Sequence, residues 1–262
     1  KEFNVISLSQ NNKFKISQDN YYSNPKNRYE ELLGCSQEKD AEICIEQLAL
    51  FKIYRFDWLV LDHYSLDHKW YEAFLRISKA HSHLFKNIKD IKLLVIDDLA
   101  NREFKANILL NQNFYIEDIN SIYKELLPAN CVKLLGPSYA LLSKEYSKLH
   151  KTKYLRKELN RVLIYFGGND IYDLTLISLQ ALMSPEFSNI EVDIVLGIQS
   201  KNIDLVREKV RLRPLTNLYT HQKSLASLIL NADLAIGAGG ATTWERFCLS
   251  LPSIVVTVAD NQ

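Results

Sequence analysis

The stretch that decides the fold is RVLIYFGGND at residues 161–170, where a run of strand character leads directly into two glycines, an amide and a carboxylate. A second stretch, DLAIGAGGATT at residues 233–243, repeats this arrangement with an apolar run, three glycines and two threonines. Helical patterns follow both stretches, at residues 171–183 and 242–251. A buried strand, a glycine-rich turn and a helix in this order are typical of a parallel α/β sheet.

The same alternation continues along most of the chain. We predict further strands over residues 58–61, 92–96, 108–110, 132–135, 192–196, 217–220 and 253–258, and further helices over residues 38–54, 67–83, 201–211 and 222–231. A weaker strand pattern covers residues 3–8, and residues 10–36 have no clear period. Because the strands are apolar throughout, they indicate parallel sheets that helices cover on both faces.

This pattern predicts two domains, over residues 1–143 and 161–262, joined by a linker at residues 144–160. The linker is strongly basic. Its basic residues are Lys144, Lys148, Lys151, Lys153, Arg156 and Lys157. We interpret them as the solvated face of a helix, and contact with a phosphate or a membrane is the alternative.

Composition and charge exclude several classes of protein. The chain has 262 residues and a net charge of +1, which argues against the basic surface that nucleic-acid binding requires. No run approaches the roughly 18 apolar residues of a membrane span. The four cysteines have no C-x-x-C pairing, so we interpret them as reduced thiols of a cytoplasmic protein rather than as a disulfide or metal site.

Polar clusters follow six of the predicted strands, each at the strand's carboxyl end. The clusters are Asp62, His63 and Tyr64; Asp97 and Asp98; Asn111, Gln112 and Asn113; Gly167, Gly168, Asn169 and Asp170; residues 237–243; and Asp260, Asn261 and Gln262. Ligands of open parallel sheets bind outside the carboxyl ends of the strands. The clusters therefore predict that two domains face each other across one ligand-binding cleft.

Glycine usage points to a phosphate at this cleft. Five of the eight glycines fall in the two quoted stretches, at 167, 168, 237, 239 and 240. Glycine lets a ligand approach the backbone, and we expect each loop to lead into a helix whose free N–H groups favour an anion. Neither loop is G-x-G-x-x-G or a P-loop, so dinucleotide dehydrogenases and P-loop NTPases fit poorly.

Three side chains beside the second loop have two interpretations each. Thr242 or Thr243 caps the helix or donates its hydroxyl to the phosphate. Glu245 follows Thr242 by three positions, so it closes a capping box or accepts hydrogen bonds from ribose hydroxyls.

The paired Asp97 and Asp98 suggest a metal site, but no third ligand is spaced suitably. We favour hydrogen bonds from these carboxylates to loops or to a sugar.

Seven motifs, in order along the chain, carry a resemblance to one family. They are DWLVLDHY at residues 57–64, LLVIDDLA at 93–100, LLNQN at 109–113, LLGPSYALL at 134–142, FGGND at 166–170, AIGAGGATTWER at 235–246 and VADNQ at 258–262. Together they resemble the UDP-2,4-diacetamido-2,4,6-trideoxy-β-L-altropyranose hydrolases of pseudaminic acid biosynthesis. The resemblance runs from about residue 57 to the end, and the earlier residues align only loosely.

The resemblance implies a glycosyltransferase-B-like architecture of two Rossmann-like domains with the site between them. It implies that the second domain holds UDP through Gly167, Gly168, Asn169, Gly239, Gly240, Thr242, Thr243, Glu245, Asn261 and Gln262. The first domain would hold the sugar, with Asp62, His63 and Tyr64 near the anomeric carbon. Water would attack this carbon with inversion, without a metal or another cofactor. The implied partner is a UDP-sugar, with no nucleic acid or membrane, and fusion to neighbouring pathway enzymes is possible.

The base of this family is a histidine in a Gly-x-Gly-His loop, a motif that does not occur in this chain. The chain begins with Lys1 and ends just after a strand pattern, so we expect it to be truncated at both ends and nearly inactive on its own. His63 is the alternative base, although we favour a role in which it orients the substrate or packs beside Tyr64. A glycosyltransferase and a non-catalytic nucleotide-sugar-binding module remain open as other functions.

Overall fold

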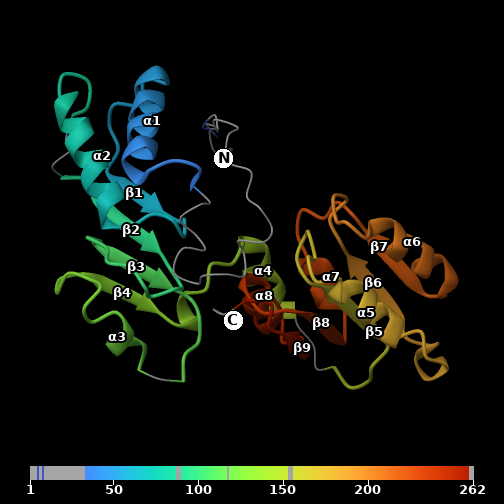
Figure 1. Ribbon diagram of the computed structural model, residues 1–262. Coiled ribbons are helices and arrows are strands. Elements are labelled where there is room, and N and C mark those ends of the chain that lie inside the picture. Colours follow the sequence, from blue (N-terminus) through green and yellow to red (C-terminus); the bar gives the residue numbers. More distant parts are fainter. Residues whose placement is uncertain are drawn as a thin grey trace. The chain divides into compact units, whose positions relative to one another are not determined.

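The computed structural model in Figure 1 is an α/β protein with two parallel sheets, which confirms the predicted fold class. It describes Val5, Leu8 and residues 33–86, 90–116, 118–152 and 156–259. The strand predicted at residues 3–8 and most of the loop predicted at residues 10–36 lie outside these residues, apart from Val5 and Leu8. The chain divides into two compact units, Lys1–Ala140 and Leu141–Gln262. Each unit has its own sheet and its own core.

The first unit contains a four-stranded sheet in the order β1-β2-β3-β4, with every pair of neighbours parallel. Its strands are β1 (Trp58–Leu61), β2 (Lys92–Ile96), β3 (Ile108–Asn111) and β4 (Val132–Leu135), and its helices are α1 (Gln37–Leu50), α2 (His68–Ala80), α3 (Ile119–Ile122) and the 3₁₀ turn η4 (Pro137–Tyr139). All four strands lie where the sequence predicts them, to within one residue. Apolar runs that are buried on a sheet give this sharp signal.

The helices α1 and α2 pack side by side in this unit (Figure 1). Each begins at a side-chain cap: Ser36 accepts from the N–H of Lys39 at 3.2 Å, and Asp67 accepts from the N–H of Lys69 at 2.7 Å. The Trp70 indole donates to the carboxylate of Asp40 across the helix pair at 2.8 Å. These contacts fix the two helices against a core of apolar side chains from β1, β2 and β3.

The second unit contains a five-stranded sheet in the order β7-β6-β5-β8-β9, again with parallel neighbours. Its strands are β5 (Arg161–Tyr165), β6 (Glu191–Val195), β7 (Thr216–Tyr219), β8 (Leu234–Ala238) and β9 (Ser253–Val256), and its helices are α4 (Lys144–Leu149), α5 (Leu174–Ala181), α6 (Ile203–Leu212), α7 (Ala226–Asn231) and α8 (Ala241–Cys248), with 3₁₀ turns η5 (His150–Thr152) and η6 (Pro185–Phe187). The chain winds outward from β5 through β6 to β7 and then returns to place β8 on the other side of β5. The strand order therefore reverses between β5 and β8.

Both faces of the second sheet are buried at its centre, as the apolar strands predicted. Val162 and Ile164 pack with residues of α5 and α6, whereas Leu163 between them packs with residues of α4, α7 and α8. Alternate residues of a strand point to opposite faces, so the two clusters lie on opposite sides of the sheet.

The predicted linker lies within the second unit and contains α4 and η5. Tyr146 of α4 is buried against α7 and α8 residues. The described lysines of this segment are exposed, as a solvated face requires. Arg156 is the exception, because its guanidinium donates to five backbone carbonyls at the carboxyl ends of α7 and α8.

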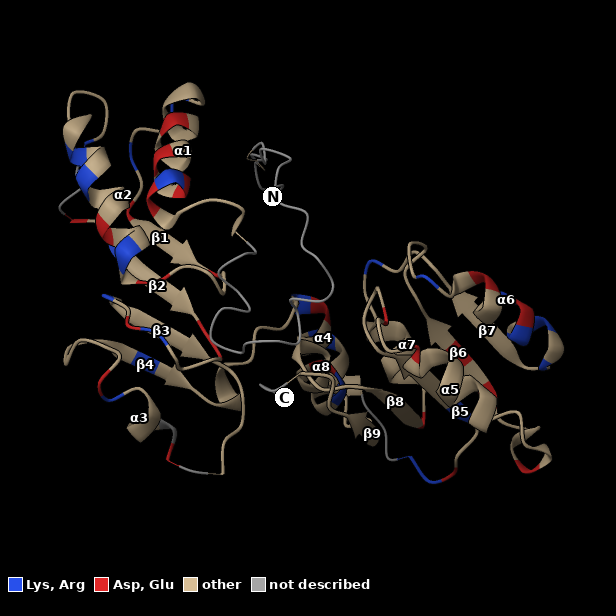
Figure 2. Ribbon diagram, in the orientation of Figure 1, with Lys and Arg blue, Asp and Glu red and all other residues tan. Residues whose placement is uncertain are grey.

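The distribution of charges and the state of the cysteines are consistent with the sequence analysis. Acidic and basic residues are interspersed along α1, α2 and α6 (Figure 2). Within the described ranges, no helix has both the length and the apolar character that a bilayer crossing demands. All four cysteines are thiols without a disulfide, and burial raises the pKa of Cys44 to about 12.

Candidate functional site

The two glycine-rich loops begin side by side at the carboxyl edge of the second sheet. Tyr165, the last residue of β5, pairs with Gly237 of β8. The loops that contain Gly167 and Gly239 therefore follow two neighbouring strands, β5 and β8, between which the strand order reverses. Such a reversal opens a crevice at the strand ends, and this is where open α/β sheets bind their ligands.

The loop after β5 leaves open space above its glycines. Gly167 has φ of 94°, and a Cβ atom added to Gly167 or Gly168 would meet no atom within 4 Å. The carbonyl of Gly168 accepts from the N–H of Gly197 at 2.8 Å, and that of Asn169 accepts from the Ser200 hydroxyl at 3.2 Å. The loop is thus tied to the loop after β6 while its glycine surface stays exposed to a ligand.

The start of α5 does not offer the N–H groups that the sequence predicted. The buried carboxylate of Asp170 accepts from the N–H groups of Leu174 at 3.0 Å and Thr175 at 2.8 Å. These are the first two residues of α5. The prediction that both loops present open helix starts is therefore wrong for this loop, because the chain supplies its own anion there.

The start of α8 is open. Its N-cap residue is Gly240, with φ of 128°, and no side chain in the described part of the chain caps the helix. A helix start without a cap keeps N–H groups and the positive end of its dipole available for an anion. Of the two loops, the one after β8 therefore matches the predicted phosphate site.

Gly237 has a different role from the one predicted, because it belongs to β8 and not to the loop. A Cβ atom at this position would lie 2.4 Å from the carbonyl oxygen of Tyr165 and 2.9 Å from Nη1 of Arg246. The absent side chain lets strand and guanidinium pack closely, so this glycine serves packing rather than ligand approach.

Glu245 does not close a capping box. Gly240 is the N-cap, so the third helical position is Thr243 and not Glu245. The half-buried carboxylate of Glu245 lies near the hydroxyl of Tyr146. This hydroxyl is buried, and no described residue is placed to form a hydrogen bond with it. Burial raises the pKa of Glu245, and burial followed by the charge of Glu245 raises the pKa of Tyr146. The alternative role, as an acceptor for ribose hydroxyls, stays a prediction.

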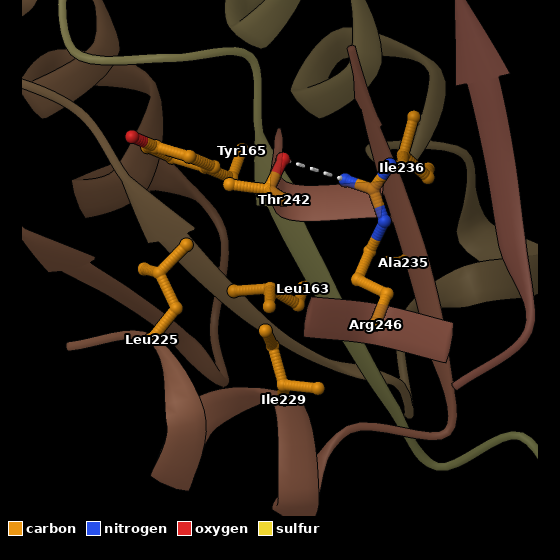
Figure 3. A pocket seen from close by; sticks show the side chains of 8 residues that line it. All are labelled: Leu163, Tyr165, Leu225, Ile229, Ala235, Ile236, Thr242 and Arg246. Atoms are coloured by element: carbon orange, nitrogen blue, oxygen red, sulfur yellow. Dashed lines mark hydrogen bonds between the residues drawn. The ribbon is translucent and has the colours of Figure 1, made fainter. Parts of the chain in front are cut away.

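A narrow pocket lies beneath the start of α8. Its lining residues are Leu163, Tyr165, Leu225, Ile229, Ala235, Ile236, Thr242 and Arg246 (Figure 3). These side chains pack so closely that no position between them has room for a water molecule. A substrate cannot enter it. The open surface formed by the glycine loops is the candidate site instead.

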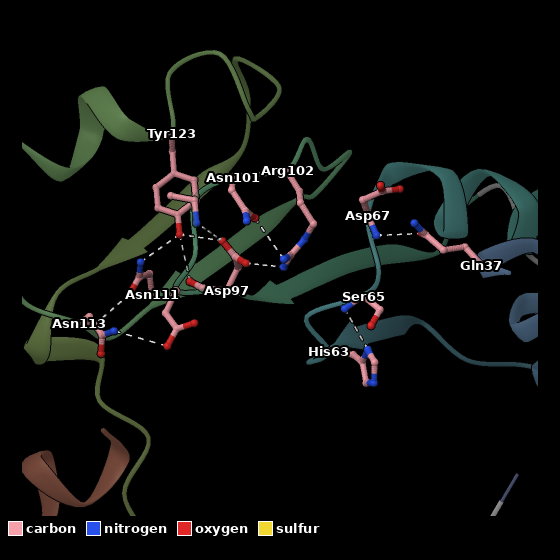
Figure 4. Close-up of polar contacts among 12 residues, drawn as sticks. Gln37, His63, Ser65, Asp67, Asp97, Asn101, Arg102, Asn111, Asn113 and Tyr123 are labelled. Carbon is pink, nitrogen blue, oxygen red and sulfur yellow. Dashed lines mark hydrogen bonds and ion pairs between the residues drawn. The ribbon is translucent and has the colours of Figure 1, made fainter. Parts of the chain in front are cut away.

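In the first unit, Asp62, His63 and Tyr64 follow β1 and are all exposed. The Nδ1 atom of His63 accepts the backbone N–H of Ser65 at 3.1 Å (Figure 4). A neutral imidazole that accepts at Nδ1 carries its proton on Nε2. His63 therefore presents a donor to a ligand. This geometry supports the orienting role rather than that of a base.

Asp97 is engaged within its own unit. It is buried, and its carboxylate accepts from Arg102 at 2.6 Å, from the Tyr123 hydroxyl at 3.0 Å and from the N–H of Ala100 at 2.9 Å (Figure 4). Asn111 joins this network through Tyr123 at 3.0 Å. Among the described residues, no three His, Cys, Asp or Glu side chains could hold a metal. The favoured interpretation, hydrogen bonding to loops, matches these contacts of Asp97.

Two further predicted residues, Asn261 and Gln262, lie outside the described residues, as does Asp260. Two other residues beside the site were missed. Arg246 follows Thr242 by four positions and Thr243 by three, a helical spacing that could have revealed its contact with them. Tyr146 gave no such signal, since it lies almost a hundred residues before Glu245 in the chain.

Comparison with known proteins finds distant relatives, and no family model matches the chain. The chain is 24% identical over 187 residues to the spore coat polysaccharide biosynthesis protein SpsG of Bacillus subtilis, covering 70% of this chain and 54% of that protein. It is 26% identical over 214 residues to the uncharacterized protein MJ1062 of Methanocaldococcus jannaschii, covering 66% and 42%. The chain thus spans about half the length of these two relatives.

The match to a third relative covers a larger share of that protein. The chain is 25% identical over 225 residues to the UDP-2,4-diacetamido-2,4,6-trideoxy-β-L-altropyranose hydrolase of Campylobacter jejuni, covering 86% of this chain and 75% of that protein. Among solved structures, MurG of Acinetobacter baumannii aligns with a TM-score of 0.49 and 14% identity over 86% of this chain and 59% of that one. The resemblance drawn from the motifs thus has a counterpart in a distant match over most of the chain.

Proposed function

We propose that the second unit binds the UDP part of a nucleotide sugar, with the phosphates at the start of α8. One observation carries this proposal. Two glycine loops flank the reversal between β5 and β8, and the helix after one of them is uncapped. An exposed glycine backbone and free helix N–H groups suit a diphosphate. Gly167, Gly168, Asn169, Gly239, Gly240, Thr242, Thr243, Glu245, Asn261 and Gln262 are the residues proposed to contact UDP.

We infer further that the reaction is hydrolysis of the UDP-sugar. Two relatives act in carbohydrate chemistry by their names, and the one that matches 86% of this chain hydrolyses UDP-2,4-diacetamido-2,4,6-trideoxy-β-L-altropyranose. This nucleotide sugar is the proposed substrate. The whole protein would then act as an enzyme on a polysaccharide-precursor route.

In the proposed reaction, water attacks the anomeric carbon, the bond from this carbon to the UDP oxygen breaks, and the configuration inverts. The proton that the water loses passes to solvent or to the histidine base that the family resemblance implies. The start of α8 stabilises the negative charge that develops on the leaving diphosphate. Asp62, His63 and Tyr64 bind the sugar, with His63 donating a hydrogen bond through Nε2. The proposal requires one UDP-sugar to reach both units.

The test is UDP release without an acceptor. We expect the full-length protein, incubated with the UDP-sugar alone, to release UDP and reducing sugar in equal amounts. UDP release that appears only after an acceptor is added would identify a glycosyltransferase instead. The 262-residue chain, which has no Gly-x-Gly-His motif, is expected to bind UDP but to release it from the sugar very slowly. Failure of both proteins to bind UDP in calorimetry would refute the proposal.

A further inference from the structure

A buried guanidinium lies directly behind the start of α8. Arg246 is only 2% exposed, and its side chain runs back toward the first turn of its own helix. Its Nη2 donates to the carbonyl of Ala238 at 2.9 Å and to Oγ1 of Thr243 at 3.1 Å. Its Nη1 donates to Oγ1 of Thr242 at 3.4 Å (Figure 3). One side chain thus joins the end of β8 to both threonines of the proposed phosphate loop.

This position is unfavourable for a cation. The Nε atom of Arg246 is buried and has no hydrogen-bond partner among the described residues. The guanidinium forms no ion pair with a carboxylate of those residues; burial lowers the pKa of Arg246, and the charge of the neighbouring Glu245 opposes this shift without cancelling it. A buried charge without a paired counter-charge destabilises a fold. An anion bound nearby would offset this cost.

The same contacts set the direction of the two hydroxyl groups. Each threonine oxygen accepts an N–H from Arg246, and neither hydroxyl donates to an acceptor among the described residues. A hydroxyl that accepts a hydrogen bond still has its own hydrogen to donate. Thr242 and Thr243 are therefore held as donors. Together with the uncapped N–H groups of α8, they make a set of donors that suits phosphate oxygens.

The fold also makes room for this cation. Gly237 leaves the space that a Cβ atom would take, 2.9 Å from Nη1 of Arg246. The placement of the guanidinium therefore depends on a glycine near the carboxyl end of a strand, a position where glycine is otherwise unfavourable.

We propose that Arg246 is a positioning residue for the diphosphate, which orients the Thr242 and Thr243 hydroxyls as donors and adds a fixed positive charge behind them. This inference rests on the proposed function, namely that the start of α8 binds the phosphates of UDP. It predicts that Arg246 governs how strongly the protein prefers UDP to the uncharged nucleoside uridine.

The experiment measures the affinities of UDP and uridine for the 262-residue chain and its Arg246→Met and Arg246→Lys variants. Calorimetry serves for UDP and ligand-observed NMR for uridine. We expect Arg246→Met to lower the ratio of UDP to uridine affinity at least tenfold. Arg246→Lys, which keeps the charge without the forked geometry, should lie between Met and the natural residue. Circular dichroism checks that each variant is folded.

A second variant tests the hydroxyls if Arg246→Met does not fold. Thr242→Val with Thr243→Val keeps the side-chain shape, removes both donors and should lower the same ratio. Unchanged ratios in every folded variant, or equal losses of UDP and uridine, would overturn the role of Arg246. If the unsubstituted chain binds no UDP at all, the proposed function itself is refuted. This result differs from unchanged ratios in the variants, which would refute only the role of Arg246.

Discussion

At the scale of single residues, glycine serves two purposes at the carboxyl edge of the second sheet. Gly237 is tightly enclosed, since its missing Cβ atom would overlap the backbone of β5. Gly168 faces open space and has no left-handed backbone angle. The same substitution at these two positions therefore separates packing from ligand approach.

We expect Gly237→Ala to lower the free energy of unfolding by roughly 1–3 kcal/mol, because the added methyl group overpacks a buried strand. Gly168→Ala should change stability by less than about 0.5 kcal/mol. It should nevertheless weaken UDP binding about tenfold, or ~1.4 kcal/mol, by blocking the approach of the ligand to the backbone. Urea unfolding and calorimetry measure both variants. A stable Gly237→Ala variant would contradict the contacts described for β8.

The sequence predicted where polar residues follow strands, but not how each of them is used. A strand that is apolar throughout ends where its polar residues begin, so the placement of His63 or Gly167 could be inferred. Asp97 and Asp170 look alike in the sequence, yet one pairs with Arg102 and Tyr123 and the other caps α5. Such pairing depends on three-dimensional contacts that spacing alone does not reveal.

At the scale of elements, one side chain closes the ends of two helices. Arg156 donates to Ala232 and Ile229 at the end of α7 and to Leu249 and Ser250 after α8, among other carbonyls. The last carbonyls of a helix have no partner within the helix, and a cation there also opposes the negative end of the dipole. Arg156 thus stabilises the carboxyl end of α8, the helix whose start is the proposed phosphate site.

Replacing Arg156 should loosen that helix. Arg156→Ala leaves several carbonyls without their charged donor, and we expect it to lower the free energy of unfolding by about 2–4 kcal/mol. Lys157→Ala, at the exposed neighbouring position, is the matched control and should change stability by less than about 0.5 kcal/mol. Thermal unfolding of both variants gives the comparison. Equal stabilities would mean that these hydrogen bonds contribute nothing in solution.

The long-range role of Arg156 was invisible in the sequence. A helix was expected near α4, but only as a solvated face and not as an element that packs against the core of the second unit. The helix has only six residues, too few for a clear apolar period, and its lysines suggested a linker. The strands were predictable because each is a short apolar run that ends where polar residues begin. A brief helix that packs through Tyr146 and Leu149 has no comparable signature.

At the scale of the whole molecule, the chain is two α/β units, each with its own core. The second unit contains both glycine loops and α8, and the first contains Asp62, His63 and Tyr64. The predicted cleft between domains therefore amounts to the prediction that one ligand contacts residues of both units. Under the proposed function, UDP alone would contact only the second unit, whereas an intact UDP-sugar would also contact the loop after β1 in the first unit.

Hydrogen exchange followed by mass spectrometry can test this division. We expect UDP to slow exchange in the peptides around residues 166–170 and 239–246 and to leave those around residues 58–66 unchanged. The UDP-sugar should protect both sets, because its sugar would contact the loop after β1. Uridine, which has no phosphates, serves as the control and should protect residues 239–246 much less than UDP. If the UDP-sugar protects only the second unit, the nucleotide site would stand, but Asp62, His63 and Tyr64 would lose their proposed part in binding the sugar.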